Sequence, residues 1–167
     1  VAGEAAAEIS SLGYPPPEGL DVLREAIAAH MEAWGISCTP GQVLVSSGAL
    51  QALQMISVSL LSAGSTVYAE APSYIKSLQV FQSAGMKLAG VPMDEHGLDV
   101  DALGKLMGGG SQSEGMTAAV PSAPQTSLPP RAKATRENDA VLYTIPTNHN
   151  PTGVTMSEPR RRALIAS

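Results

Sequence analysis

The clearest pattern along the chain is a stripe of apolar residues that recurs at spacings of three and four. The stripe consists of Leu20, Leu23, Ile27, Met31 and Trp34. This spacing is typical of an amphipathic helix that buries one face. Gly35 comes next, and a glycine just past the last periodic residue commonly ends a helix. The pattern therefore predicts one helix from about residue 20 to residue 34.

Farther along, short apolar runs alternate with helical patterns. The runs predicted to be strands are 43–45, 66–69, 87–92 and 141–145. The helical patterns lie at about 50–60, 75–81, 99–107 and 158–166. The run at 43–45 is apolar throughout, as expected of a central parallel strand that is covered on both faces. The helix that follows it is expected to bury Leu50, Leu53, Ile56 and Leu60.

This alternation predicts an α/β fold with a mostly parallel sheet, right-handed crossovers and helices on both faces. Ligands of such sheets bind at the carboxyl ends of the strands. Three predicted strand ends carry suitable groups: a Ser-Ser-Gly turn at Gly48, the aromatic ring of Tyr74 and the amide of Asn150. A helix start suits phosphate, and a ring can stack on a flat ligand. Together they suit a flat, phosphorylated heteroaromatic molecule, although each stretch alone could be only a turn.

Composition limits the classes of protein. The chain has 167 residues, 44% of them hydrophobic, which suffices for one domain or part of one. A net charge of −5 argues against nucleic acid as a partner of this segment. No apolar run approaches the roughly 18 residues of a membrane span. The single Cys38 excludes an intrachain disulfide and fits a reducing, cytoplasmic location.

Residues 108–137 differ in character from the rest. The segment begins with three glycines and continues with a stretch rich in Pro, Ser and Ala that lacks aromatic side chains. It could divide two domains. We favour a low-complexity insertion within one domain, because the apolar strand at 141–145 needs sheet partners, and these lie before residue 100.

Two other motifs suggest chemistry that the rest of the sequence does not support. Ser73-Tyr74-Ile75-Lys76 spells the S-x-x-K signature of penicillin-binding proteins and serine β-lactamases, but neither S-D-N nor K-T-G is present. Asp94, Glu95 and His96 resemble a metal cluster. Adjacent side chains point apart, however, so a solvated turn is expected there.

Five motifs in a fixed order resemble the large domain of fold-type I, pyridoxal-phosphate-dependent aminotransferases of class I/II. They are Tyr14 and Gly19 with L-R-E-A-I-A at 23–28, V-S-S-G-A-L-Q-A-L at 45–53, E-A-P-S-Y at 70–74, V-P-M-D-E-H-G-L at 91–98, and L-Y-T-I-P at 142–146 leading to N-P-T-G at 150–153. The chain is most similar to the subgroup of aminoadipate/kynurenine-type enzymes and the aminotransferase-like domains of GntR/MocR regulators. The resemblance covers residues 14–167 apart from the insertion, which makes residues 1–167 a partial large domain.

The resemblance implies a role for particular residues toward pyridoxal 5'-phosphate. Gly48, Ala49 and Leu50 would present backbone amides to the cofactor phosphate. Tyr74 would stack on the pyridine ring, and Asn150 would hydrogen-bond its 3-hydroxyl oxygen. In this family a tyrosine at the position of Tyr14 reaches the phosphate of the neighbouring subunit's site. A homodimer is therefore implied for the full-length protein.

The sequence also departs from the family pattern. The phosphate turn commonly carries a polar residue where Leu50 stands, and the usual Gly-Asp is Gly64-Ser65. Asn148 is a rival to Asn150, which we prefer because it directly precedes Pro151. In the family, the Schiff-base lysine and the residues that hold the pyridine nitrogen and the substrate carboxylate follow N-P-T-G. None of the present lysines lies in that context: Lys76, Lys87, Lys105 and Lys133.

The resemblance implies an enzyme of amino-acid metabolism that moves an amino group between an amino acid and a 2-oxo acid. Since the lysine is expected beyond residue 167, the sequence contains no catalytic residue and the isolated segment is expected to be inactive. The alternative is a binding module: a domain that senses pyridoxal phosphate inside a GntR/MocR-type transcription regulator. An upstream winged-helix segment would distinguish the two.

Overall fold

The computed structural model of the chain describes residues 14–108 and 140–166. It divides into two compact units, residues 1–49 and residues 50–167, and each is described by itself. Most of the predicted insertion lies outside the described residues. No helix within 14–108 or 140–166 is long and apolar enough to cross a membrane.

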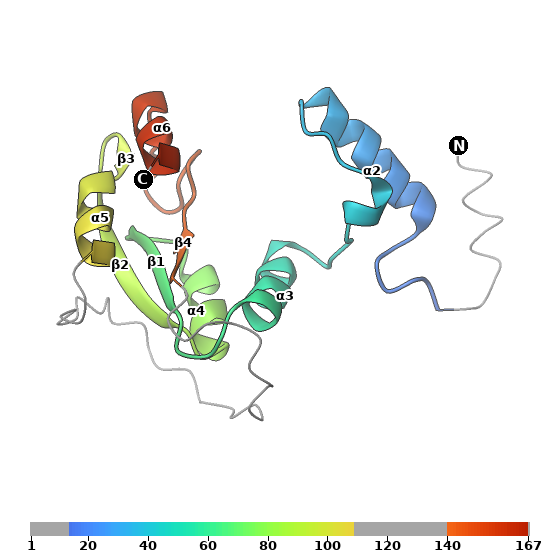
Figure 1. Cartoon of the computed structure of the whole chain (residues 1–167), viewed down its shortest axis with the longest axis horizontal. Coiled ribbons are helices and arrows are strands. Elements are labelled where there is room, and N and C mark those ends of the chain that lie inside the picture. Colours follow the sequence, from blue (N-terminus) through green and yellow to red (C-terminus); the bar gives the residue numbers. More distant parts are fainter. Residues whose placement is uncertain (1–13, 109–139, 167) are drawn as a thin grey trace. The chain divides into compact units, whose positions relative to one another are not determined.

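The first unit contains the predicted amphipathic helix, α2 (Asp21–Ala33), and a short 3-10 helix, η1 (Pro40–Gln42) (Figure 1). Gly35 has a φ of 77°, and its N–H donates to the carbonyl of Glu32, while the Ile36 N–H donates to that of Met31. These two bonds satisfy carbonyls that the helix end would otherwise leave open. The predicted helix and its end at Gly35 are therefore confirmed.

Two packing expectations for this unit are wrong. The apolar stripe of α2 is largely uncovered, with Leu23 44% and Trp34 73% exposed, and only Ala28 of the helix is buried. Residues 43–45 form an extended segment, not a strand, and Leu44 is 52% exposed. Backbone groups of this segment bond elsewhere than in a sheet: the Val45 N–H donates to the carbonyl of Glu18, 2.9 Å away.

The second unit is built on a four-stranded sheet of order β3-β2-β1-β4. β1 (Thr66–Ala71) pairs in parallel with β2 (Lys87–Asp94) on one side and with β4 (Ala140–Tyr143) on the other. The two-residue β3 (Gly97–Leu98) is antiparallel to β2. The predicted mostly parallel sheet is confirmed, and the strand near 141–145 does pair with a strand before residue 100.

Four helices accompany this sheet: α3 (Ala49–Leu60), α4 (Ile75–Ser83), α5 (Val100–Gly108) and α6 (Glu158–Ala166) (Figure 1). One buried cluster joins Val67 of β1 to Phe81 of α4, with Leu53 of α3 packed against it. A second cluster contains Val91 of β2 and Leu103 of α5.

Successive residues of one strand pack alternately with the first and the second buried cluster. Val67 lies in the first cluster and Tyr68 packs against the second. Leu142 packs against the second and Tyr143 against the first. Because successive side chains of a strand point to opposite faces, the clusters lie on opposite faces of the sheet. Helices on both faces, and hence the α/β fold class, are confirmed.

The buried face of α3 differs from the prediction. Leu53 packs against the first cluster as expected, but Leu50, Ile56 and Leu60 are 38%, 48% and 63% exposed. The fully buried side chain of this helix is Ser57, whose hydroxyl donates to the carbonyl of Leu53 at 2.8 Å. A local hydrogen bond to the preceding turn satisfies this hydroxyl, so a polar residue can be buried at this position.

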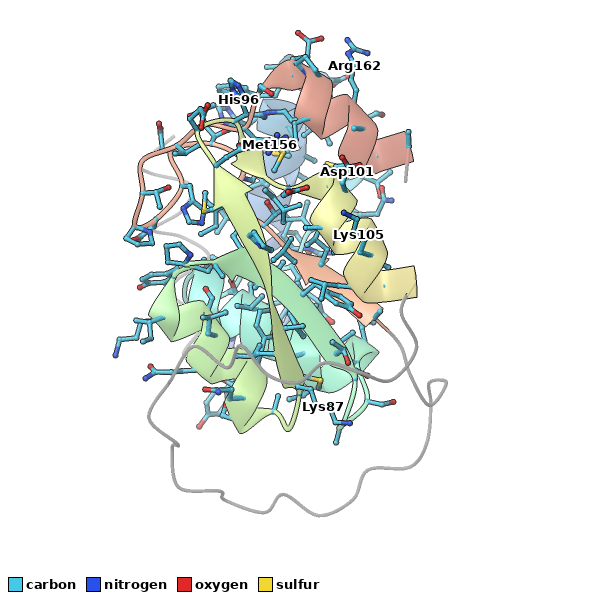
Figure 2. The ribbon with its side chains drawn as sticks, turned by 90° about the vertical axis from the view of Figure 1, so that its left-hand side faces the viewer. Lys87, His96, Asp101, Lys105, Met156 and Arg162 are labelled. Carbon is cyan, nitrogen blue, oxygen red and sulfur yellow. The ribbon has the colours of Figure 1, made fainter. Side chains whose placement is uncertain are left out.

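A clasp made by Arg160 of α6 holds the turn between β2 and β3. Its guanidinium donates to both carboxylate oxygens of Asp94, at 2.8 and 3.0 Å, and to the carbonyls of Gly97 and Leu98 at 3.0 and 3.1 Å. The hydrogen bond from Arg160 holds the pKa of Asp94 below its ordinary value, and the His96 backbone N–H adds to this effect. His96 at this turn and Met156, which lies in the second cluster, are labelled in Figure 2.

Candidate functional site

The candidate site lies where two neighbouring strands end. β1 and β4 are parallel, with Ala69 opposite Tyr143, so their carboxyl ends meet at the same edge of the sheet. The chain that leaves β1 carries Tyr74, and the chain that leaves β4 carries Asn150. Both are predicted site residues. The topology thus brings their two loops to the edge where ligands of parallel sheets bind.

Tyr74 is fixed at the start of α4. The loop from β1 passes through a cis peptide bond between Ala71 and Pro72 and reaches Tyr74, the residue that caps the helix. The Tyr74 carbonyl accepts from the N–H groups of Ser77 and Leu78 at 3.1 and 3.3 Å. Its side chain is only partly buried. The helix start therefore holds the backbone of Tyr74 while part of the residue stays accessible to a ligand.

Asn150 lies on a closed turn. The His149 N–H donates to the carbonyl of Val154 at 2.8 Å, and the Gly153 N–H donates back to the carbonyl of His149. Asn150 is exposed within this turn, and its bond to Pro151 is cis. The rival Asn148 is also exposed, but it has a φ of 49°, a left-handed conformation that asparagine adopts more readily than most residues. The backbone conformation at position 148 therefore favours asparagine, whereas the backbone at position 150 has no such preference.

A buried polar network lies beneath this turn. Glu70 of β1 and His149 are 3% and 2% exposed. One oxygen of the Glu70 carboxylate accepts from the Thr144 hydroxyl at 2.6 Å, and the other accepts from the Ile145 N–H at 2.9 Å. The Nδ1 atom of His149 lies 2.9 Å from the Thr152 hydroxyl oxygen. The network joins the end of β1 to the chain that follows β4.

Sequence patterns did not indicate a role for Glu70 or His149. The signal that could have found Glu70 is the two-residue alternation along β1, which places it on the same sheet face as Tyr68. Tyr68 packs against a buried cluster, so the pattern sets a carboxylate toward the interior. A buried carboxylate requires partners, and its partners come from a segment some seventy positions away, which no local pattern indicates.

The predicted phosphate turn at Gly48 has a backbone conformation with positive φ, which glycine adopts readily. Gly48 has a φ of 106°, and a Cβ built there would meet nothing within 4 Å, so conformation and not crowding favours glycine. Ala49 begins α3, and Leu50 is 38% exposed. The division between the two units falls between Ala49 and Leu50. The approach of this turn to Tyr74 and Asn150 therefore stays a prediction.

Two further expectations can be compared with the structure. Tyr14 belongs to the first unit and is fully exposed, so its predicted role toward a neighbouring subunit also stays a prediction. Within residues 14–108 and 140–166, no three His, Cys, Asp or Glu side chains are grouped so that they could together hold an ion. Asp94 instead pairs with Arg160, as described above.

Comparison with known proteins identifies the class of protein that this fold and edge define. Residues 2–166 match the family described as aminotransferase class I and II. Because the match spans nearly the whole chain, the chain belongs to this family. The resemblance seen in the ordered motifs is thereby confirmed.

Its relatives include regulators as well as enzymes. The chain is 41% identical over 166 residues to the uncharacterized HTH-type transcriptional regulator YdfD of Bacillus subtilis, covering 98% of this chain and 28% of the regulator. It is 33% identical over 170 residues to a 2-aminoadipate transaminase of Thermus thermophilus, covering 98% of this chain and 35% of the enzyme. The chain thus spans about a third of the length of these relatives.

Solved structures agree on the fold. An archaeal alanine:glyoxylate aminotransferase matches with a TM-score of 0.70 and 31% identity, over 98% of this chain and 36% of the enzyme. LysN, the α-aminoadipate aminotransferase of Thermus thermophilus, matches with a TM-score of 0.66 and 33% identity, over 99% of this chain and 36% of the enzyme. That crystal structure contains N-(5'-phosphopyridoxyl)-L-leucine.

Proposed function

We propose that this segment forms part of the pyridoxal 5'-phosphate site of an aminotransferase, which moves an amino group between an amino acid and a 2-oxo acid. The observation that carries the proposal is the match to the aminotransferase family over residues 2–166. Two solved relatives hold related compounds: PMP in a kynurenine aminotransferase of Pyrococcus horikoshii and N-(5'-phosphopyridoxyl)-L-leucine in LysN. The meeting of the loops of Tyr74 and Asn150 at one edge of the sheet supports it further.

The chemical groups that this chain offers fit the cofactor. Tyr74 offers an aromatic ring for stacking on the pyridine. Asn150 offers an amide donor for the ring's 3-hydroxyl oxygen. Gly48, Ala49 and Leu50 would contribute the N–H groups of a helix start to the phosphate. When bound, the cofactor supplies an electron sink for the reaction, whereas the residues of this chain hold and orient it.

A second candidate function rests on a specific observation. The chain is 41% and 42% identical to two HTH-type transcriptional regulators of Bacillus subtilis, and 33% identical to the 2-aminoadipate transaminase. In this alternative the same edge binds pyridoxal phosphate as a signal inside a regulator. Both functions need the contacts of Tyr74 and Asn150, and they differ in whether amino acids are turned over.

The proposal also extends to assembly and location. The resemblance implies that Tyr14 reaches a neighbouring subunit's phosphate, so the full-length protein is proposed to be a homodimer. The full exposure of Tyr14 is compatible with this role. Sedimentation of the full-length protein at several concentrations would test this state, and a monomer at every concentration would contradict it. A cytoplasmic location is part of the same proposal.

The decisive experiment uses the full-length protein that the gene encodes. Pyridoxal phosphate is titrated while its absorption spectrum is recorded, and a panel of amino acids with a 2-oxo acid is then assayed for transfer. Binding with turnover supports the enzyme. Binding without turnover, together with an upstream DNA-binding segment, supports the regulator. A wild-type protein that does not bind the cofactor would overturn both.

The two asparagines of the turn provide a matched pair of variants. Asn150→Ala removes the amide proposed to reach the cofactor, and we expect the dissociation constant to rise about tenfold, as for loss of one hydrogen bond to a charged group. Asn148→Gly removes the rival amide and tolerates the left-handed backbone there. The opposite order of effects would reassign the contact to Asn148.

A further inference from the structure

Glu70 and His149 are unusual in being titratable side chains that the sheet buries almost completely. They are 3% and 2% exposed. A buried carboxylate is costly unless it is hydrogen-bonded and paired. Neither side chain takes part in the proposed contacts with the cofactor. Their burial at the edge that carries Tyr74 and Asn150 therefore calls for another explanation.

The Glu70 carboxylate ties the end of β1 to the chain that leaves β4. Its two oxygens accept from the Thr144 hydroxyl at 2.6 Å and from the Ile145 N–H at 2.9 Å. Both partners immediately follow β4, which ends at Tyr143. The first bond is short, as expected when the acceptor is ionised. These bonds fix where the chain starts its path toward Asn150.

The imidazole of His149 closes the turn itself. Its Nδ1 atom lies 2.9 Å from the Thr152 hydroxyl oxygen, which also accepts from the Val154 N–H at 3.3 Å. Asn150 and Pro151 lie in the chain between these two joined side chains. A bond across the turn therefore restrains the residue proposed to meet the cofactor.

The other ring nitrogen faces the carboxylate. His149 Nε2 is 3.4 Å from Glu70 Oε2, within ion-pair distance but longer than a good hydrogen bond. An Nε2 that carries a proton can face an ionised oxygen, whereas a lone pair there would be repelled. The Thr152 hydroxyl can then donate to Nδ1 while its oxygen accepts from the Val154 N–H. The contact of Nε2 with Glu70 is electrostatic, because Nε2 makes no hydrogen bond.

We propose that Glu70 and His149 are positioning residues: they hold the Asn150 turn in register with the loop that carries Tyr74. The proposal rests on the pyridoxal phosphate site proposed above. Glu70 belongs to the strand that leads to Tyr74, and His149 directly precedes Asn150. The contact between Glu70 and His149 therefore sets the distance between Tyr74 and Asn150, the two residues that would contact the cofactor ring. Small errors in such a distance reduce binding.

A double-mutant cycle in the full-length protein separates positioning from a general structural role. His149→Ala is expected to raise the dissociation constant of pyridoxal phosphate about tenfold, by releasing a hydrogen-bonded side chain next to Asn150. If His149 acts through Asn150, the same substitution in an Asn150→Ala background should change the constant by about twofold or less. An equal change in both backgrounds would overturn the proposal.

Gentler variants keep the test decisive if His149→Ala does not fold. Glu70→Gln retains the shape of the side chain, and His149→Asn retains a polar atom near Nδ1 for Thr152. Each should weaken cofactor binding in the wild-type background and lose that effect beside Asn150→Ala. Tyr68→Phe is the matched control: it lies on the same strand and removes the bond of the Tyr68 hydroxyl to the Leu106 carbonyl, 3.3 Å away. We expect that it leaves the dissociation constant within about twofold.

Hydrogen exchange of the cofactor-free protein tests the restraint without any ligand. The Gly153 N–H, which bonds across the turn, should exchange about tenfold faster in His149→Ala than in wild type if the side chain closes the turn, since a tenfold change corresponds to the loss of one such bond. Unchanged exchange would overturn the proposal even if the cofactor binds. Faster exchange in His149→Ala, found together with a wild-type protein that binds no cofactor, would keep the restraint and overturn only the proposed function.

Discussion

Gly97, the first residue of β3, offers the sharpest test of how the second unit is packed. Its φ is 101°, a region that residues with a Cβ rarely adopt. A Cβ built there would lie 3.0 Å from both Cβ and Cγ of Met156 and 3.1 Å from its Cα. Because one of these atoms is backbone, a change of side-chain rotamer cannot relieve the crowding. Gly97→Ala must therefore shift the chain at Met156, bend the turn, or both.

The cost can be estimated from two separate contributions. A residue held in a sparsely populated backbone conformation costs about 1–3 kcal/mol. Adding a methyl group to a well-packed core costs about 1–3 kcal/mol. Gly97→Ala is thus expected to lower the free energy of unfolding by about 2–6 kcal/mol, against roughly 0.5 kcal/mol for an ordinary surface substitution. The effect should also reach the site, since the Met156 N–H donates to the carbonyl of Pro146, 2.9 Å away, in the chain that leads to Asn150.

Gly104 provides the control for this variant. It lies inside α5, is exposed, and a Cβ there would meet nothing within 4 Å. Gly104→Ala should raise the free energy of unfolding by about 0.5–1 kcal/mol, because alanine is the better helix former. Urea unfolding of the full-length protein, with the slope compared among variants, measures both changes. If Gly97→Ala unfolds within about 0.5 kcal/mol of wild type, the crowding argument is refuted.

Three further predictions concern the cofactor, the clasp and the insertion. Tyr74→Ala should weaken cofactor binding by about 1–2 kcal/mol and Tyr74→Phe much less; equal losses in a cofactor titration would implicate the hydroxyl and not the ring. The pKa of Asp94 is lowered from 3.8 by Arg160, so its pairing stabilises the fold above that pH and is lost as pH falls below it. The thermal midpoints of Asp94→Asn and wild type should therefore differ at neutral pH and converge under acid, and a constant difference would contradict this. Shortening residues 108–133 to a brief Gly/Ser loop should leave cofactor binding intact, as loop length costs little; a loss of binding would show that the segment contributes to the site.

The sequence by itself determined most of the local elements of the second unit. The apolar runs and the glycines that end helices located β1, β2, β4 and the helices between them, because these signals arise from spacings within one element. It also placed Tyr74 and Asn150 after two different strands of a parallel sheet. The carboxyl ends of parallel strands lie at one edge of a sheet, so the loops of both residues were predicted to share that edge. The parallel pairing of β1 with β4 confirms this.

Other features were decided only by the tertiary structure. Residues 43–45 have the composition of a central strand, yet the Val45 N–H bonds to Glu18 and the segment forms no ladder. The two residues of β3 are too few to show any periodicity, and their position depends on the clasp of Arg160. In each case the partner lies far away along the chain.

The buried network shows the same limit at the candidate site. Glu70 and His149 each look like an ordinary polar residue beside a turn, and both are almost fully buried. Whether a carboxylate can be buried depends on the hydrogen-bond donors around it. Those donors, Thr144 and Ile145, reach Glu70 only because β4 pairs with β1. Sequence patterns report which residues repeat along an element, whereas the partner of a buried charge is set by which distant strands lie side by side.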